Sequence, residues 1–175
     1  MDLIPAWIDG VLQPVDKLAV HRRGLRHKAV SVFVMAGNAV LIQQRAAGKY
    51  HTPNLWANTC CTHPYWGEGD LDCAHRRVAE ELGITGLDLA PVGEVTYRAD
   101  VGAGLIEDEV VQVFTAQAAK TLPLTLNPDE VQAARWVSLP ELRGEIADDP
   151  TRFTPWLRIY LTDHHAQIFG EAAPL

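Results

Sequence analysis

The sequence predicts a single α+β domain, because segments typical of sheet strands and of amphipathic helices alternate along one chain of 175 residues. Residues 30–35 are apolar on both faces, as in a buried strand, and residues 105–114 also have the composition of a strand. Residues 70–82 instead repeat apolar side chains at four-residue spacing, which is typical of a helix. No internal repeat, low-complexity tract or linker divides the chain, so we expect one domain over residues 1–175.

Composition limits the possible partners and the compartment. The net charge of −7 argues against a surface for nucleic acid or for an anionic membrane, so an anionic ligand needs a local cluster of Lys and Arg. No N-terminal signal and no apolar run of membrane-spanning length is present. The 3 cysteines make a poor disulfide framework. We expect a cytoplasmic protein with reduced thiols, either a monomer or a homodimer.

The remaining strands are bounded by turn residues. Residues 7–12 indicate a hairpin around Asp9 and Gly10, and residues 36–38 turn the chain from the strand at 30–35 into a strand at 40–45. Further strands are expected at 92–98 and 130–137, with a Gly-rich loop at 99–104.

Two helices are expected near the C-terminus. Ser138 and Glu141 form a capping-box pattern for a short helix. Thr154 and Pro155 indicate the cap and first turn of the last helix, which extends to Ile168.

The helix at 70–82 carries paired charges. Asp70 is its expected N-cap, and Gly83 the left-handed residue that ends it. Arg76 and Arg77 each precede a glutamate by four residues, so acids and bases form parallel rows on the face opposite the apolar one. Such a helix can also be an ordinary solvent-exposed amphipathic helix.

Side chains suited to proton transfer and metal binding lie on both sides of this helix. Cys61 and His63 are two residues apart in the preceding loop. Glu107 and Glu109 share one face of a strand that continues as apolar, which is costly unless a cation neutralises them. The alternative is an edge strand with solvated acids. Cys60 and Cys73 are interpreted as small apolar fillers.

Other candidates are ambiguous as single residues. His21 and His27 are six residues apart, and Gly24 permits a turn that brings both imidazoles together. Arg45 and Lys49 leave a strand and are either anion ligands or exposed cations. A helical aromatic such as Trp156 is more often a core residue, and His51 has no assigned role.

A resemblance to a known family connects these residues. Glu68, Arg76, Glu80, Glu81 and Gly83 fall on the register of the Nudix box, from which Thr62 and Arg77 depart. With Cys-x-His-Pro at 61–64 and Arg-Arg at 76–77, the pattern resembles the type I isopentenyl-diphosphate isomerases. The resemblance covers about four-fifths of the chain and implies a Nudix-like α/β/α sandwich with a mixed β-sheet and additional strands and helices around it.

The resemblance also implies a role for each candidate. A borderline ion, Mn²⁺ or Zn²⁺, suits a site of imidazoles and carboxylates, made here by His21, His27, His63, Glu107 and Glu109. Some family members have one more residue between the first two histidines. Mg²⁺ accompanies the substrate diphosphate on Glu81. The implied diphosphate contacts are Lys17, Arg45, Lys49, Arg76 and Arg77, although the last two are also candidates for salt bridges within the helix.

The implied reaction is the isomerisation of isopentenyl diphosphate to dimethylallyl diphosphate, in isoprenoid biosynthesis, through a carbocation. Cys61 and Glu109 form the acid–base pair, Tyr97 lies near the proton relay, and Trp156 stabilises positive charge. The pocket must be dry and must hold a five-carbon unit. The alternatives are a Nudix hydrolase of a nucleoside-diphosphate derivative and a non-catalytic, metal-stabilised binding domain.

Overall fold

One mixed β-sheet forms the centre of the computed structural model, which describes residues 2–170. Within this range nine strands join the sheet, and five of them follow the order β2-β1-β3-β4-β5. Strands β6 and β8 add to β3, β7 adds to β8, and β9 adds to β4. The β3–β8 pair is parallel and every other named pair is antiparallel. The elements are β1 (Leu3–Ile8), β2 (Val11–Asp16), α1 (Lys17–Arg23), β3 (Arg26–Ala36), β4 (Ala39–Arg45), β5 (Trp56–Ala57), β6 (Cys60–Thr62), α2 (Asp70–Leu82), β7 (Ala90–Gly102), β8 (Leu105–Gln117), β9 (Val131–Ser138), α3 (Leu139–Asp148), the 3-10 turn η1 (Pro150–Arg152), α4 (Pro155–Asp163) and α5 (His165–Phe169).

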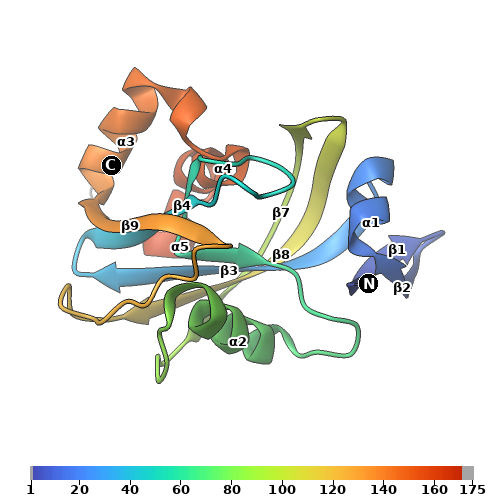
Figure 1. The fold of residues 1–175 in the computed structure, drawn as a ribbon, viewed down its shortest axis with the longest axis horizontal. Coiled ribbons are helices and arrows are strands. Elements are labelled where there is room, and N and C mark those ends of the chain that lie inside the picture. The colour runs from blue at the N-terminus through green and yellow to red at the C-terminus, as the bar shows by residue number, and fades with distance from the viewer. Residues whose placement is uncertain (1, 171–175) are drawn as a thin grey trace.

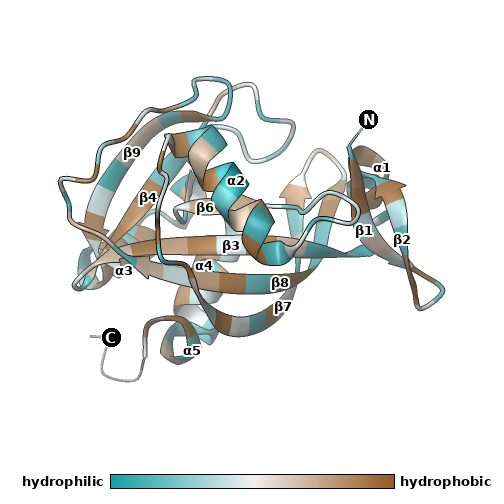
Figure 2. Ribbon diagram, turned by 90° about the horizontal axis from the view of Figure 1, so that it is seen from below, coloured by the Kyte–Doolittle hydropathy of each residue, from teal (hydrophilic) through white to brown (hydrophobic). Residues whose placement is uncertain are grey.

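Helices cover both faces of this sheet (Figures 1 and 2). One apolar core packs α2 against β3, β4 and β8, with Val32, Leu41 and Val78 among its buried members. The other core lies between the sheet and the helices α3, α4 and α5, and includes Phe33 and Tyr160. The predicted α+β sandwich with a mixed sheet is confirmed. No helix within residues 2–170 is both long enough and apolar enough to span a membrane.

The N-terminal segment folds as a hairpin followed by a helix that the sequence analysis missed. The hairpin is confirmed, with Asp9 and Gly10 both at positive φ, as a type I′ turn requires. The backbone N–H of Ala19 donates to the Asp16 carboxylate at 3.0 Å, which caps α1. Gly24 ends α1 at φ 58° and turns the chain into β3.

Helix α2 has the predicted apolar face and C-terminus but a different N-cap. Its N-cap is Gly69, so the assignment of Asp70 as the cap is wrong. The Asp70 carboxylate instead accepts from Lys28 Nζ at 3.0 and 3.1 Å, and an ion pair to the sheet replaces the capping interaction. Gly83 ends the helix at φ 68°, as expected.

Gly83 should tolerate no side chain. A Cβ at this position would lie 2.7 Å from Cβ of Thr125, in addition to the strain of the positive φ. We expect Gly83→Ala to lower the free energy of unfolding by about 1–2 kcal/mol from the left-handed conformation and by about 1–3 kcal/mol more from overpacking. Gly86→Ala is the matched control, because Gly86 has φ 72° but no atom within 4 Å of its added Cβ. Urea denaturation of both variants measures the difference, and equal losses would contradict the packing argument.

Two further expectations differ from the structure. Of the predicted loop at 99–104 only residues 103 and 104 form a turn, because β7 continues to Gly102 and pairs Ala99 with Glu107 of β8. The last helix is divided at His164 into α4 and α5. The capping box at Ser138 is confirmed, whereas Thr154 occupies the N-cap of α4 without a side-chain capping hydrogen bond.

Candidate active site

Strand register places two buried carboxylates beside a histidine and a tyrosine. The parallel β3–β8 ladder sets His27 opposite Glu109, and the antiparallel β7–β8 ladder sets Tyr97 opposite the same glutamate. Glu107 precedes Glu109 by two residues and therefore faces the same side of β8. The two glutamates are only 2% and 0% exposed. Since β8 lies between β3 and β7, the alternative of an edge strand with solvated acids is wrong.

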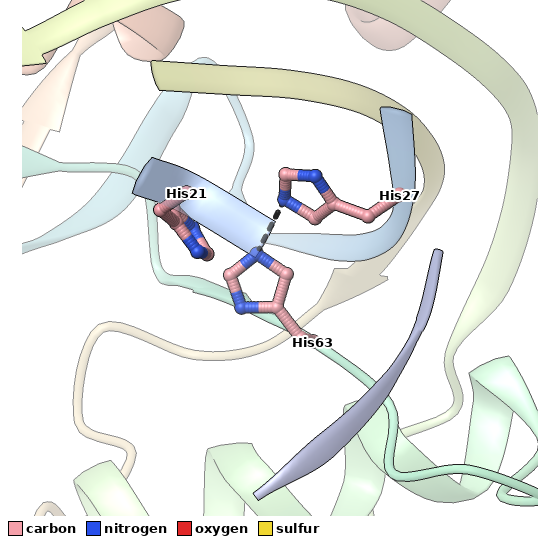
Figure 3. A group of neighbouring side chains, drawn as sticks. All are labelled: His21, His27 and His63. Atoms are coloured by element: carbon pink, nitrogen blue, oxygen red, sulfur yellow. Dashed lines mark hydrogen bonds between the residues drawn. The ribbon is translucent and has the colours of Figure 1, made fainter. Parts of the chain in front are cut away.

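Three imidazoles converge on Glu109. His21 comes from α1, His27 from β3 and His63 from the residue after β6, and Figure 3 shows their rings pointing toward one another. Nε2 of His63 lies 3.2 Å from Nε2 of His27 and 2.9 Å from Oε1 of Glu109. One potential ligand atom of each histidine lies within 4.8 Å of the other two.

The hydrogen bonds of the outer ring nitrogens indicate a cation site. Nδ1 of His21 and of His27 each lies 2.7 Å from a backbone carbonyl oxygen, of Lys17 and Leu25 respectively. A carbonyl only accepts, so Nδ1 carries a proton, and in the neutral form of these two rings Nε2 presents a lone pair to the centre. These lone pairs face Nε2 of His63 and the Glu109 carboxylate, which together form a set of ligand atoms that a divalent cation would bind. This donor set fits a divalent metal ion, with the Nδ1 bonds holding each ring in place.

Tyr97 connects the two carboxylates. Its hydroxyl donates to Oε2 of Glu109 at 2.5 Å and lies 2.9 Å from Oε2 of Glu107. Burial and the neighbouring Glu109 charge raise the pKa of Glu107 well above its usual value. Burial also acts to raise the pKa of Glu109, but the facing imidazoles of His27 and His63 outweigh it and hold that pKa well below its usual value. The pKa values of the two carboxyl groups are therefore shifted in opposite directions.

Cys61 lies on β6, next to β3, and the surroundings of its thiol favour the protonated form. The β3–β6 ladder pairs it with Ser31, whose hydroxyl donates to Sγ of Cys61 at 3.3 Å and lies 2.8 Å from the Tyr160 hydroxyl. Burial, followed by the charges of Glu109 and Glu107, raises the pKa of the Cys61 thiol well above its usual value. Because a thiolate is the nucleophilic form, this thiol is not activated for covalent catalysis, and it holds a proton that a strongly basic carbon would accept.

Two adjoining cavities meet at this site. The first is lined by residues that include Cys61, Glu107 and Trp156, and has a volume of about 20 Å³. That space accommodates roughly one water molecule, so it is smaller than the five-carbon pocket expected from the sequence. Tyr50 also borders it and is 39% exposed, so it forms part of the wall between this cavity and solvent.

The second cavity, of about 80 Å³, is lined by four cationic side chains, Lys17, Lys49, Arg76 and Arg77. Burial and the positive charges of Lys49 and Arg77 lower the pKa of Lys17 below its usual value. A bound anion would offset that mutual repulsion.

Most of the predicted anion contacts already have partners within the protein. Arg76 donates to Glu68 at 2.6 and 2.7 Å, and Arg77 donates to Glu81 at 2.6 Å. Lys49 pairs with Glu130. The alternative of internal salt bridges for both arginines therefore describes this structure, and anion binding requires the cations to exchange or share these partners.

Arg45 is held more tightly than an exposed cation. It is 8% exposed and donates to the backbone carbonyl oxygens of Thr52 and His51, each at 3.2 Å. Its guanidinium carbon lies 5.3 Å from the ring centroid of Trp156, a cation–π contact. Trp156 is 1% exposed and lines the first cavity.

The structure adds residues that sequence reasoning missed. Ser31 contacts the thiol and Tyr160 contacts Ser31, but neither belongs to a motif that would have indicated this. Glu130 was placed at the start of a strand, and its charge gave no sign of its pairing with Lys49 and Arg77. His51 could have been found as a fourth imidazole in a histidine-rich site.

The buried histidines should make the metal-free protein sensitive to acid. Burial lowers the pKa of His21 from 6.5 to about 4. The unfolded chain therefore binds a proton at a higher pH than the folded chain, and stability falls as pH drops from 6.5 toward 4. Thermal unfolding in EDTA across this range measures the effect, which His21→Asn should reduce. A melting temperature independent of pH between 6.5 and 5 would contradict it.

Solved structures share this fold at low sequence identity. A Deinococcus radiodurans protein superimposes with a TM-score of 0.73 at 15% identity, over 92% of this chain and 97% of its own. A MutT NUDIX hydrolase from Burkholderia pseudomallei gives a TM-score of 0.60 at 23% identity, over 78% of this chain and 95% of its own. These similarities establish the architecture alone.

Sequence relatives are much closer. The NUDIX domain family model matches residues 25–157. Proteins named isopentenyl-diphosphate Delta-isomerase from Cereibacter sphaeroides and Dinoroseobacter shibae are 64% and 61% identical to this chain, over 97% and 98% of it and 96% and 98% of their own lengths. A third, from Rhodobacter capsulatus, is 59% identical over 96% of both chains. Because the NUDIX model matches most of the chain and these proteins are 59–64% identical to it over nearly its full length, the chain belongs to the isopentenyl-diphosphate Delta-isomerase family.

Proposed function

We propose that this protein isomerises isopentenyl diphosphate to dimethylallyl diphosphate, and so acts in isoprenoid biosynthesis. The observation that carries the proposal is a thiol and a buried carboxylate whose pKa values shift in opposite directions. Burial raises the pKa of the Cys61 thiol, whereas His27 and His63 hold the pKa of Glu109 below its usual value, and the Tyr97 hydroxyl donates to Glu109 at 2.5 Å. Such a pair supplies the acid and the base that an unactivated alkene requires.

The proposed reaction moves one double bond by two proton transfers. A proton from one group forms a C–H bond at the terminal methylene and leaves a tertiary cation at the neighbouring carbon. The other group removes a proton from the carbon next to the diphosphate-bearing one, and those electrons form the new double bond. Because the reaction is reversible, Cys61 and Glu109 each serve as acid in one direction and as base in the other.

Tyr97 and Trp156 assist these transfers. The Tyr97 hydroxyl bridges both carboxylates and can pass a proton between them. The face of Trp156 stabilises a nearby cation by about 0.5–2 kcal/mol. Since the cavity holds only about 20 Å³, substrate binding requires wall side chains such as Tyr50 to move. The surrounding apolar core then keeps water from the cation.

The proposed cofactors are a divalent ion at each end of the site. His21, His27, His63, Glu107 and Glu109 would hold Mn²⁺ or Zn²⁺, which would fix Glu109 and alter its proton affinity. Glu81, which is 4% exposed next to Arg77, would meet Mg²⁺ carried by the diphosphate. The diphosphate itself would bind in the cavity of Lys17, Lys49, Arg76 and Arg77, with Arg45 at its inner side.

Several features stay predictions from the sequence. These are the single domain over residues 1–175, the cytoplasmic location, the monomeric or homodimeric state, and the absence of nucleic-acid and membrane partners.

Turnover in D₂O tests the function. The purified protein is incubated with isopentenyl diphosphate, Mg²⁺ and Mn²⁺, without flavin, and the products are analysed by NMR. We expect dimethylallyl diphosphate that carries deuterium in a methyl group. Release of phosphate without isomerised product would contradict the proposal and favour a NUDIX hydrolase.

A further inference from the structure

His51 is a fourth buried imidazole at the metal site. It lies in the segment between β4 and β5 and is 5% exposed. Its ring stacks on that of His21, with centroids 5.6 Å apart. Its Nε2 lies 3.4 Å from Oε1 of Glu107. None of the roles assigned above to the acid–base pair, the diphosphate contacts or the five metal ligands uses this side chain.

The backbone that carries His51 is held in a strained conformation. Thr52 has φ 43° and Asn54 has φ 63°, and a β-branched residue such as threonine rarely adopts a positive φ. Arg45 donates to the carbonyl oxygens of both His51 and Thr52, and the backbone N–H of Asn54 donates to the carbonyl oxygen of Arg45. These bonds keep the imidazole directed toward Glu107.

The hydrogen-bond partners indicate which nitrogen of His51 faces the carboxylate as a donor. Nδ1 lies 2.9 Å from the Thr52 hydroxyl, which can donate to it. In this tautomer Nε2 carries the proton and lies 3.4 Å from Oε1 of Glu107, while the Tyr97 hydroxyl lies 2.9 Å from Oε2 of the same residue.

We propose that His51 is a positioning residue that donates a hydrogen bond from Nε2 to Glu107 and thereby fixes this carboxylate as a metal ligand. This inference rests on the proposed metal centre. Ligating carboxylates are commonly oriented by such hydrogen bonds. Among the described residues, ligand atoms of His21, His27 and His63 lie within 4.8 Å of one another, and so do those of His21, His51 and Glu107. His51 therefore lies on the Glu107 side of the site, and the test below distinguishes an orienting role from direct ligation.

Metal titration of the apo-protein tests this role without measuring turnover. The apo-protein is titrated with Mn²⁺ followed by EPR, and with Co²⁺ followed by its visible spectrum. We expect His51→Leu to weaken metal binding about 10–100-fold, the usual cost of losing a group that orients a ligand. His51→Gln keeps an amide donor near the position of Nε2, so its loss should be less than about tenfold. The Co²⁺ spectrum of both variants should keep the wild-type band positions, since the set of ligands is unchanged.

Two further variants separate this role from a general effect on the fold. Thr52→Val removes only the hydroxyl next to Nδ1 and should weaken metal binding less than His51→Leu. His75→Leu changes an exposed histidine of α2 and should bind as wild type does. Thermal unfolding in EDTA shows whether each apo-protein is folded. If the His51→Leu protein is not folded, the metal affinity of Thr52→Val is the result that tests the inference.

Three results would overturn the inference. The first is wild-type metal affinity in both His51→Leu and Thr52→Val. The second is equal loss in His51→Leu and His51→Gln with a changed Co²⁺ spectrum, which would make His51 a ligand. The third is a wild-type protein that binds neither ion. A wild type that binds metal but makes no dimethylallyl diphosphate would contradict the proposed function and leave the role of His51 intact.

Discussion

Cys61→Ala is expected to lower kcat by about 10⁴-fold, the upper end of what a positioned acid or base contributes. The substitution removes one of the two proton-transfer groups. Ser31 next to it is an alcohol and a far weaker acid than a thiol, and burial raises the pKa of the Tyr160 phenol well above its usual value. The fold and the metal content should remain nearly unchanged, because Cys61 is only partly buried and is not a proposed ligand. Turnover by NMR and metal analysis of the same sample measure both effects.

Cys73→Ala is the matched control for this substitution. Cys73 is fully buried in the core under α2, away from the cavity, and burial raises the pKa of its thiol to about 12. Its replacement should reduce stability slightly and leave kcat near the wild-type value. Wild-type turnover in Cys61→Ala would contradict the assignment of the thiol.

Glu109→Gln should lower both kcat and the affinity for the metal ion. The change keeps the shape of the side chain but removes the negative charge that faces His27 and His63. We expect kcat to fall by about 10²–10⁴-fold through loss of proton transfer. Metal affinity should fall as well, because an amide is a poorer ligand than a carboxylate.

Glu94→Gln, at an exposed position of β7, supplies the control and should change neither quantity. Full metal occupancy together with normal turnover in Glu109→Gln would show that neither role belongs to this residue.

Local patterns predicted the parts of the site that depend on a single element. The alternation of residues 105–114 correctly placed Glu107 and Glu109 on one buried face, because side-chain direction in a strand follows a period of two. The length of α2 and its end at Gly83 followed from helix periodicity and glycine conformation in the same way. Sequence proximity also indicated the convergence of His21 and His27, although α1 was too short to be recognised from its pattern.

Interactions between distant elements were not predictable in this way. Asp70 had a plausible local partner in the helix terminus but binds Lys28 of β3, 42 residues away. Lys49 and Arg77 share Glu130 of a later segment, so their exposure as free cations could not be judged from sequence. The small cavity volume results from how Tyr50, His51 and Trp156 pack together, and no linear motif encodes that packing.

The most direct measurement is a crystal structure of the Cys61→Ala variant loaded with Mn²⁺ and Mg²⁺ and bound to isopentenyl diphosphate, which this variant should not consume. Our account predicts the five-carbon unit between the position of the missing thiol and Glu109, beside Trp156, with the diphosphate among Lys17, Lys49 and Arg77. A hydrocarbon chain bound elsewhere, with the substituted side chain at position 61 and the Glu109 carboxylate facing separate spaces, would contradict it.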